Sequence, residues 1–415
     1  MKKKLIIKGS IAGLSMSLML LSCSLPSYPK TNIQSGSVTC TVGDETVVVE
    51  PLSKSPNSNF MRGFDASAVN DKGTGNYSDS SGNIKDIFSV LPDFGVNWVR
   101  LRVWNNPDSA LNPSVPGASN KETVVNQAVR AKANGLKILL DFHYSDYWAD
   151  PGKQLIPEDW LTCTTSDQLA QKVSDYTTEV LEALKEAGAE PNMIQIGNEI
   201  SSGILKHKAL DLDENATNAD AAVRGDFAGE NYFKYLSAGI SAARATCPKA
   251  KIMLHFTDIN RNNPASFLSD FTELDYDVVG LSWYPKWSSH GTISAMGEKV
   301  SAIIKSYNKD VVIVETSAPN TIDSDSTKNF YDSTTIANLT VNGSLYSGIT
   351  ASADGKVYAN VQNQEAILRA VIEAAVESGA SGVFSWGGEY KGSWEYGLFD
   401  GSGRPYPSLA VFKVN

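Results

Sequence analysis

Two glutamates stand at the ends of apolar segments that are typical of buried strands. Glu199 ends the segment MIQIGNE, and Glu315 ends the segment VVIVE. A carboxylate is costly to bury unless it is paired or functional. Two carboxylates at one rim can cleave a glycosidic bond, because one protonates the leaving oxygen while the other attacks or activates water. Either glutamate alone could be a structural ion-pair member, but the two together, with Asn198 before Glu199, favour catalysis.

Tryptophans indicate the kind of ligand. Six of the eight lie at or just beyond a predicted strand end, namely Trp104, Trp148, Trp283, Trp287, Trp386 and Trp394. Flat apolar rings with one polar atom can stack on sugar rings and line the subsites of a cleft. Core packing would explain any one of them but is an odd explanation for six at one rim. Trp98 and Trp160 are assigned to the core.

Eight short runs of strand-forming residues must position these side chains. They are Arg62–Ser67, Asn97–Trp104, Lys137–His143, Met193–Glu199, Lys251–Phe256, Val278–Tyr284, Val311–Glu315 and Gly382–Trp386. Between them, apolar residues recur every three or four positions, as in amphipathic helices. These helical segments include Lys121–Asn134, Ser166–Gly188, Asn231–Thr246, Ile293–Tyr307 and Gln364–Ser378. Alternating strands and helices predict parallel pairing, and eight units fit an α/β fold of the (β/α)8 TIM barrel class. A doubly wound sheet is the alternative, but no Gly-rich phosphate loop follows the first run.

In such a barrel, catalytic and binding groups lie at the carboxyl ends of the strands. Those ends here are polar or aromatic, where a purely structural core would have Val, Ile or Leu. They carry Asp65, Arg100, Arg102, Trp104, Asp141, His143, Asn198, Glu199, His255, Trp283, Tyr284, Glu315 and Trp386. In the second run Arg100 and Arg102 alternate with apolar residues, so both are expected to face the lumen. A salt bridge that only fills the barrel is the alternative role for one arginine.

Composition excludes several classes of protein. The chain has 415 residues and a formal net charge of −10 with no basic cluster, so no nucleic-acid partner is expected. Cys40, Cys163 and Cys247 are too few and too dispersed for a disulfide framework or a zinc ribbon, and structural roles are expected. A metal-dependent hydrolase that uses His143 and His255 is not favoured, because the four histidines show no HExxH or His-x-His spacing.

The N-terminal residues are typical of an export signal. Four lysines precede an apolar run, Ile11–Leu21, that is too short to cross a bilayer comfortably, and Leu-Leu-Ser-Cys ending at Cys23 resembles a bacterial lipobox. We predict a lipoprotein signal peptide over residues 1–22 and a lipid anchor on Cys23, with an ordinary secretory signal as the alternative. The protein would be exported and lie at the outer membrane, the cell surface or the periplasmic face. It would contact a membrane only through the lipid, and we expect a monomer.

A spacer is expected between the anchor and the folded body. Residues 23–59 are rich in Ser, Pro, Thr, Lys and Asn, the composition of a linker. Within it, Val38–Val49 could form a short hairpin around Gly43-Asp44. Residues 60–415 are then the catalytic domain.

Several segments resemble glycoside hydrolase family 53. They are Arg62-Gly63-Phe64-Asp65, Gly95–Pro107, Leu140–Gln154, Ile194–Ile200, Gly280–Trp287 and Val311–Ser317. The resemblance covers essentially all of residues 60–415, and its most specific part is the Ser-Asp-x-Trp-Ala-Asp-Pro run that begins at Ser145. Members of this family are endo-β-1,4-galactanases that act on type I arabinogalactan, the galactan side chains of pectin.

The resemblance implies retaining chemistry without a redox cofactor, with Glu199 as acid/base and Glu315 as nucleophile. The candidate substrate-binding residues are Asp65, Arg100, Trp104, His143, Asp146, Trp148, Asn198, Trp283, Tyr284 and Trp386. Of these, Arg100, His143, Asn198, Tyr284 and Trp386 match family positions around the bond being cut. A related endo-hydrolase of mannan or xylan and a non-catalytic glycan-binding lipoprotein are the alternatives.

Two segments depart from the family pattern. Residues 386–390 (WGGEY) differ from the bulkier family sequence that forms distal subsites. Bacterial members carry a calcium site after the seventh strand, where this chain has Asp323, Asp325 and Asn329 but lacks the family's histidine. These three oxygen donors are candidate ligands of a structural calcium ion, and a solvated turn is the alternative. No cofactor is expected to be required for the chemistry.

Overall fold

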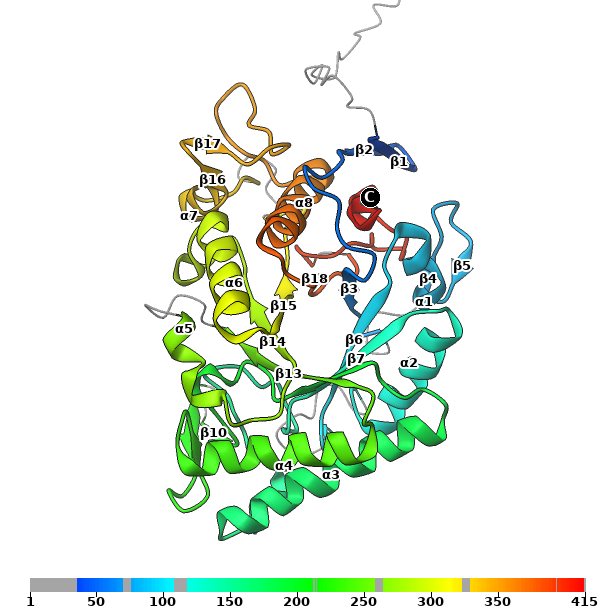
Figure 1. Cartoon of the computed structure of the whole chain (residues 1–415). Coiled ribbons are helices and arrows are strands. Elements are labelled where there is room, and N and C mark those ends of the chain that lie inside the picture. The colour runs from blue at the N-terminus through cyan, green and yellow to red at the C-terminus, as the bar shows by residue number, and fades with distance from the viewer. Residues whose placement is uncertain are drawn as a thin grey trace, which may run out of the picture. The chain divides into compact units, whose positions relative to one another are not determined.

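A closed barrel of eight parallel strands forms the centre of the computed structural model (Figure 1). The structure describes residues 36–415 except 70–75, 108–117, 212, 214, 258–263, 323–328, 393 and 414–415, and not the side chains of residues 264, 265 and 288. In chain order the barrel strands are β3 (Met61–Asp65), β6 (Trp98–Val103), β7 (Lys137–Phe142), β8 (Met193–Ile196), β13 (Lys251–Phe256), β14 (Val278–Ser282), β15 (Asp310–Thr316) and β18 (Gly382–Ser385). Pairing of β18 with β3 closes the ring. The predicted (β/α)8 barrel is confirmed.

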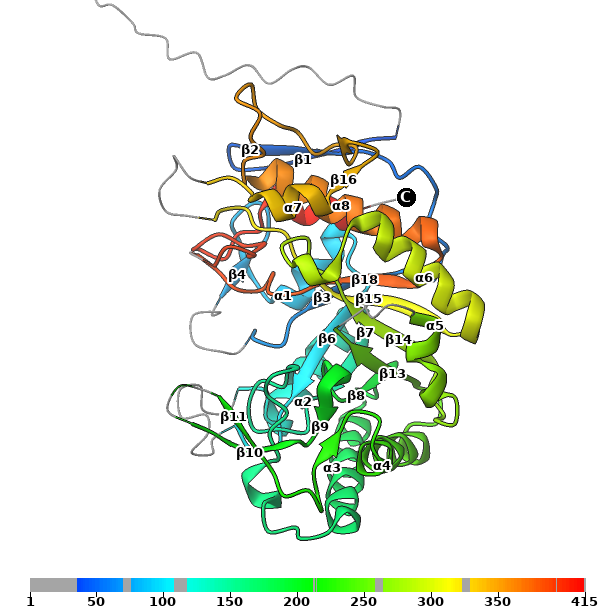
Figure 2. The same ribbon diagram turned by 90° about the vertical axis from the view of Figure 1, so that its left-hand side faces the viewer.

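Helices pack around the outside of the barrel. The longer ones are α2 (Lys121–Ala133), α3 (Ser166–Glu186), α4 (Glu230–Thr246), α6 (Ile293–Tyr307) and α8 (Val361–Ser378), close to the predicted ranges. Shorter ones are α1 (Ile87–Val90), α5 (Pro264–Phe267) and α7 (Ser333–Asn338). The polar side chains of Asn120, Thr165, Thr292 and Asn360 cap the first turns of α2, α3, α6 and α8, which explains where these helices begin. Figures 1 and 2 both show α3 and α4 side by side.

Strand side chains alternate between two apolar cores. Outward residues such as Val99 and Leu101 join the helices in one large cluster. Inward residues fill the barrel lumen with Met61, Trp98, Leu139, Met193, Met253, Val278, Val312, Val314 and Phe384. Gly63 makes room for this packing, because a Cβ there would lie 2.2 Å from the ring of Phe384. Trp98 is buried in the lumen cluster and Trp160 in the outer cluster, so both belong to the core as predicted.

The fourth barrel strand ends earlier than predicted. The sequence predicts a strand to Glu199, but β8 ends at Ile196. Gly197 has φ +80° and Glu199 has φ +49°, both in the left-handed region, so the chain turns away from the extended path. The polar residues at this end therefore lie on a turn above the barrel rather than within the strand.

Several short antiparallel pairs lie outside the barrel. They are β1 (Val38–Val42) with β2 (Glu45–Val49), β4 (Tyr77–Ser78) with β5 (Ile84–Lys85), β9 (Gly203–Ile204) with β12 (Gly225–Asp226), β10 (His207–Leu210) with β11 (Ala216–Asn218), and β16 (Thr340–Val341) with β17 (Ser344–Leu345). Figure 2 shows β10 and β11, which belong to the long segment between β8 and α4.

The predicted hairpin forms, and it corrects the predicted domain boundary. Val47 and Val49 of β2 are buried in the same apolar cluster as the barrel's outer face. The amides of Val48 and Ser53 donate to side chains of α8, to Gln362 at 3.3 Å and Glu373 at 3.0 Å. Residues from Val38 onward thus belong to the folded body, and the boundary at residue 60 is wrong.

The signal segment 1–22 and Cys23 lie outside the described residues. Cys40, Cys163 and Cys247 are free thiols. Among the helices that the structure describes, none has the length and apolar character needed to span a bilayer.

Candidate active site

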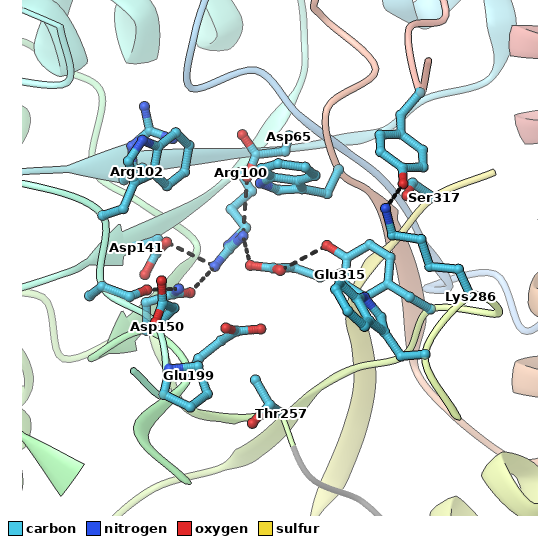
Figure 3. A pocket seen from close by; sticks show the side chains of 18 of the residues that line it. Asp65, Arg100, Arg102, Asp141, Asp150, Glu199, Thr257, Lys286, Glu315 and Ser317 are labelled. Carbon is cyan, nitrogen blue, oxygen red and sulfur yellow. Dashed lines mark hydrogen bonds and ion pairs between the residues drawn. The ribbon is translucent and has the colours of Figure 1, made fainter. Parts of the chain in front are cut away.

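A cleft of about 820 Å³ opens at the carboxyl ends of the barrel strands (Figure 3). Its floor contains Glu199, which follows β8, and Glu315, which lies in β15. Three atoms lie within 4.8 Å of one another: one carboxylate oxygen of Glu199, one of Glu315 and a ring nitrogen of His255. Both ring nitrogens of His255 have hydrogen-bond contacts with protein groups.

A register shift in β15 turns Glu315 into the cleft. Val312 and Val314 face the lumen, so strict alternation would point Glu315 outward. The pairing of β14 with β15 changes register between Leu281 and Ser282, and the pairing of β15 with β18 changes after Ile313. An extra residue in one strand re-aims the next side chain, a common feature beside active sites. Val314 and Glu315 consequently both face inward.

Arg100 holds Glu315 in place. Its Nη1 donates to Glu315 Oε1 at 2.6 Å and to Asp65 Oδ2 at 3.1 Å. Its Nη2 donates to Asn198 Oδ1 at 2.6 Å and lies 2.8 Å from Asp141 Oδ2. Burial alone would lower the pKa of this guanidinium, but the three carboxylates raise it above its usual value. The buried ion pairs both fill the barrel and fix the position of Glu315.

The two glutamates differ in their electrostatic surroundings. Burial, and then the charge of Glu315, raise the pKa of Glu199 well above its usual value. Burial also raises the pKa of Glu315, but the charge and hydrogen bond of Arg100 oppose that rise. Glu199 is therefore the group that keeps its proton when Glu315 is ionised.

Each glutamate also contacts a hydroxyl. Ser282 Oγ donates to Glu199 Oε1 at 2.7 Å, and the Tyr284 hydroxyl donates to Glu315 Oε2 at 3.0 Å. Both hydroxyl residues come from β14 or the turn that follows it. The seventh-strand glutamate is thus held from two sides, by Arg100 and by Tyr284.

A second part of the cleft is lined by Arg102, His143 and Trp148, which pack against the buried ring of Trp104. The guanidinium of Arg102 lies 4.3 Å from the ring centroid of Trp104 and 4.0 Å from that of Trp148. Trp104 Nε1 donates to His143 Nδ1 at 3.2 Å, and His143 Nε2 lies 3.1 Å from Asp141 Oδ2. Burial lowers the pKa of His143, so it faces the cleft as a neutral ring.

Comparison with known protein families shows which family has this barrel and cleft. Residues 61–413 match the model of glycosyl hydrolase family 53.

The chain belongs to glycosyl hydrolase family 53.

Relatives with names and solved structures agree with that assignment. An endo-β-1,4-galactanase of Bacillus subtilis is 30% identical over 86% of each chain. An arabinogalactan endo-β-1,4-galactanase of Cellvibrio japonicus is 33% identical over 64% of this chain and 68% of its own. The family 53 catalytic domain of Ignisphaera aggregans superposes with a TM-score of 0.70 at 31% identity, covering 89% of this chain and 99% of that one. An intracellular xylanase of Thermoanaerobacterium saccharolyticum shares the fold alone, at 13% identity and a TM-score of 0.52.

Family 53 membership makes the protein a glycoside hydrolase. The non-catalytic glycan-binding lipoprotein and the mannan or xylan hydrolase are accordingly not favoured. The cleft contains most of the residues predicted to bind substrate in this family 53 enzyme. Those that line it are Asp65, Arg100, His143, Trp148, Asn198, Tyr284 and Trp386.

Three predicted binding residues do not line the cleft. Trp283 is fully buried in the outer core, because its neighbours Ser282 and Tyr284 face inward and alternation turns it outward. Trp104 is buried behind Trp148 and His143. Asp146 is buried and accepts from the amides of Asn106 and Glu158, so it shapes the loop after β7.

The candidate calcium ligands are only partly described. Asp323 and Asp325 lie outside the described residues. Asn329 is described, and its side chain bonds to the protein: Oδ1 accepts from the amide of Ile322, and Nδ2 donates to the carbonyl of Ala359.

Sequence reasoning missed several groups in the cleft of this family 53 enzyme and in the buried layer behind it. Gln195 bridges Arg100 and Asp141 from within β8, and inward alternation in that strand was a usable signal for it. Ser282 was detectable in the same way. Lys286, Glu395 and Tyr396 line the cleft from loops, where no periodic signal exists. Trp287 and Trp394 line it as predicted.

Proposed function

We propose that the protein is a retaining, endo-acting β-1,4-galactanase that cleaves the galactan of type I arabinogalactan. The names of the curated relatives support this substrate. The observation that carries the mechanism is the separation of Glu199 and Glu315, whose nearest carboxylate oxygens lie within 4.8 Å. Retaining enzymes hold their carboxyl groups about 5–5.5 Å apart, whereas inverting enzymes need about 6.5–9.5 Å to admit a water molecule.

In the first step Glu199 is the acid and Glu315 the nucleophile. Glu199 gives its proton to the glycosidic oxygen while a carboxylate oxygen of Glu315 bonds to the anomeric carbon, and the bond to the leaving chain breaks. Because its pKa is raised, Glu199 holds the proton that it transfers, and the ion pair with Arg100 keeps Glu315 ionised. The product is a galactosyl ester on Glu315 and a free chain end.

In the second step the roles change. Glu199, now deprotonated, takes a proton from water, and the resulting hydroxide bonds to the anomeric carbon as the ester to Glu315 breaks. Two inversions restore the β configuration. The side chains of Asp65, His143, Trp148, Asn198, Tyr284 and Trp386 line the cleft around this centre, and we propose that they hold the sugar rings.

Azide rescue tests the roles of the two glutamates. With a dinitrophenyl galactobioside, whose leaving group needs no protonation, Glu199→Ala should release the phenol in a burst and then stall. Azide should restore turnover and give the β-galactosyl azide, because this small anion attacks the anomeric carbon without a base and displaces the Glu315 carboxylate. Glu315→Ala should give only the α azide. Rescue of Glu315→Ala to a retained product, with no rescue of Glu199→Ala, would reverse the roles. The exposed Glu122→Ala on α2 should behave as wild type.

We also propose that residues 1–22 are a lipoprotein signal and that Cys23 is the lipid anchor, so that the enzyme is tethered at the outer membrane, the cell surface or the periplasmic face. The basic start and the Leu-Leu-Ser-Cys motif support this location. Labelled fatty acid should enter the wild-type protein, and Cys23→Ala should remove the label and move the protein to the soluble fraction. An unchanged label would contradict the anchor.

Calcium, if bound by Asp323, Asp325 and Asn329, would act on loop stability. The groups that transfer the proton and form the ester are Glu199 and Glu315. We propose that a chelator lowers only the melting temperature, and that the rate constant on galactan is unchanged at temperatures below the melting temperature.

We also propose that the protein is a monomer in solution, which light scattering tests.

A further inference from the structure

One hydroxyl is held between the acid/base and a buried histidine. Ser282 Oγ lies 2.7 Å from Glu199 Oε1 and 2.9 Å from His255 Nε2. His255 Nδ1 in turn lies 2.9 Å from Asn198 Oδ1 and 3.3 Å from the amide nitrogen of Glu199. Ser282 and His255 are fully buried. The two residues come from neighbouring strands, β14 and β13, so the contact is fixed by the barrel itself.

The same register shift that turns Glu315 inward also sets Ser282 opposite it. Pairing of β14 with β15 resumes with Ser282 opposite Glu315 after the shift. Ser282 therefore stands on the strand beside the nucleophile while its hydroxyl reaches the acid/base. A group at this position can control Glu199 without touching the sugar.

We propose that Ser282, held by His255, is the positioning residue of the acid/base; this proposal rests on the proposed function. A carboxyl group has two oxygens, and only one can carry the transferable proton toward the glycosidic oxygen. The Ser282 hydroxyl donates to Oε1 and so leaves Oε2 for that proton. Glu199 itself stands on a left-handed turn, with φ +49°, so its side chain leaves the backbone in a direction that regular strand geometry would not give it.

The charges around Glu199 predict the sign of the effect. Burial raises the pKa of Glu199 most, and the charges of Glu315 on β15 and Asp150 after β7 raise it further, while the Ser282 hydrogen bond and the charge of Arg100 on β6 lower it. The hydroxyl stabilises the ionised form, so its removal raises the pKa of Glu199 further. The alkaline limb of the pH profile, which reports loss of the Glu199 proton, should then move to higher pH.

The test compares two leaving groups in Ser282→Ala. On a phenyl galactobioside, whose leaving group needs a proton, kcat/KM should fall about tenfold or more, since a hydrogen bond to an ionisable group is lost. On the dinitrophenyl analogue, which needs none, kcat/KM should fall less than about threefold. The alkaline limb should shift upward on the phenyl substrate. Ser282→Cys, of similar shape but a weak donor, should reproduce the split.

Thr316→Val is the matched control. Thr316 is a buried hydroxyl residue beside Glu315 whose Oγ1 has no hydrogen-bond partner among the described residues. Its replacement should leave the ratio of the two rates unchanged. Equal losses on both substrates in Ser282→Ala, or an alkaline limb that stays or falls, would overturn the proposal. A wild-type enzyme that hydrolyses the aryl galactobiosides but not galactan would instead contradict the proposed substrate.

Discussion

At the scale of single residues, Arg100 explains how acidic groups share one buried site. It bonds to Asp65, Asp141 and Glu315, so three carboxylates face one guanidinium. A buried charge is tolerated when it is paired and hydrogen-bonded. Glu199 instead contacts the neutral Ser282, and burial and then the charge of Glu315 raise the pKa of Glu199 well above its usual value. The difference between acid and nucleophile follows from which glutamate the arginine contacts.

Glu315→Gln should lower the pKa of Glu199. After burial, the charge of Glu315 is the largest cause of the raised pKa, and glutamine removes the charge while keeping the shape. The galactosyl ester removes the same charge during catalysis, so the variant reproduces the change that turns Glu199 from acid into base. Titration of labelled glutamate carboxyls by ¹³C NMR measures this. An unchanged or higher pKa would contradict the proposed relation between the two groups.

At the scale of the elements, alternation explains which parts of the site could be predicted from the sequence. Arg100 and Arg102 face inward as their spacing indicates, and both line the cleft. The same rule separates Tyr284, which faces inward, from Trp283, which packs in the outer core, so two adjacent strand residues could not both be ligands and the prediction of Trp283 is wrong. Local periodicity also predicts the barrel, because the outer helices bury one face and the strands alternate with them along the chain.

Other features of the site depend on pairing between distant strands. The inward turn of Glu315 needs the register shift against β14 and β18, and no local pattern in β15 indicates it. The left-handed turn that carries Glu199 is set by Gly197 and the contacts above β8. Loop residues such as Lys286 and Tyr396 meet only in the folded molecule. These arrangements depend on contacts between distant segments, so no local pattern in a single sequence reveals them.

The lumen packing gives a prediction about β3. Gly63→Ala would place a methyl group 2.2 Å from the ring of Phe384, which is enclosed by the barrel and cannot move away cheaply. Overpacking of this kind costs about 1–3 kcal/mol. Gly297→Ala is the control, because it adds a methyl within α6 at ordinary contact distance and should stabilise by up to about 1 kcal/mol. Urea unfolding curves of both variants measure the two effects, and equal midpoints would contradict the packing argument.

At the scale of the whole molecule, the barrel brings together side chains from Asp65 to Trp386 that are far apart in the chain. Each strand contributes at its carboxyl end, so one cleft collects groups from the full ring of strands. The N-terminal hairpin, β1 with β2, packs against α8 instead and contributes no residue to the cleft. Stability and catalysis therefore depend on different parts of the folded body.

Removal of the hairpin should separate these two properties. A chain that begins at residue 54 loses Val47, Val49 and Leu52, which are buried against the body. Each buried aliphatic side chain contributes about 1.5–3 kcal/mol, so the truncated enzyme should unfold at a clearly lower urea concentration. Below that concentration its kcat/KM on galactan should equal that of a chain beginning at residue 36, which keeps the hairpin. Equal unfolding midpoints would show that residues 36–53 act as a spacer after all, and a loss of activity in the fully folded truncated chain would show that the hairpin shapes the cleft.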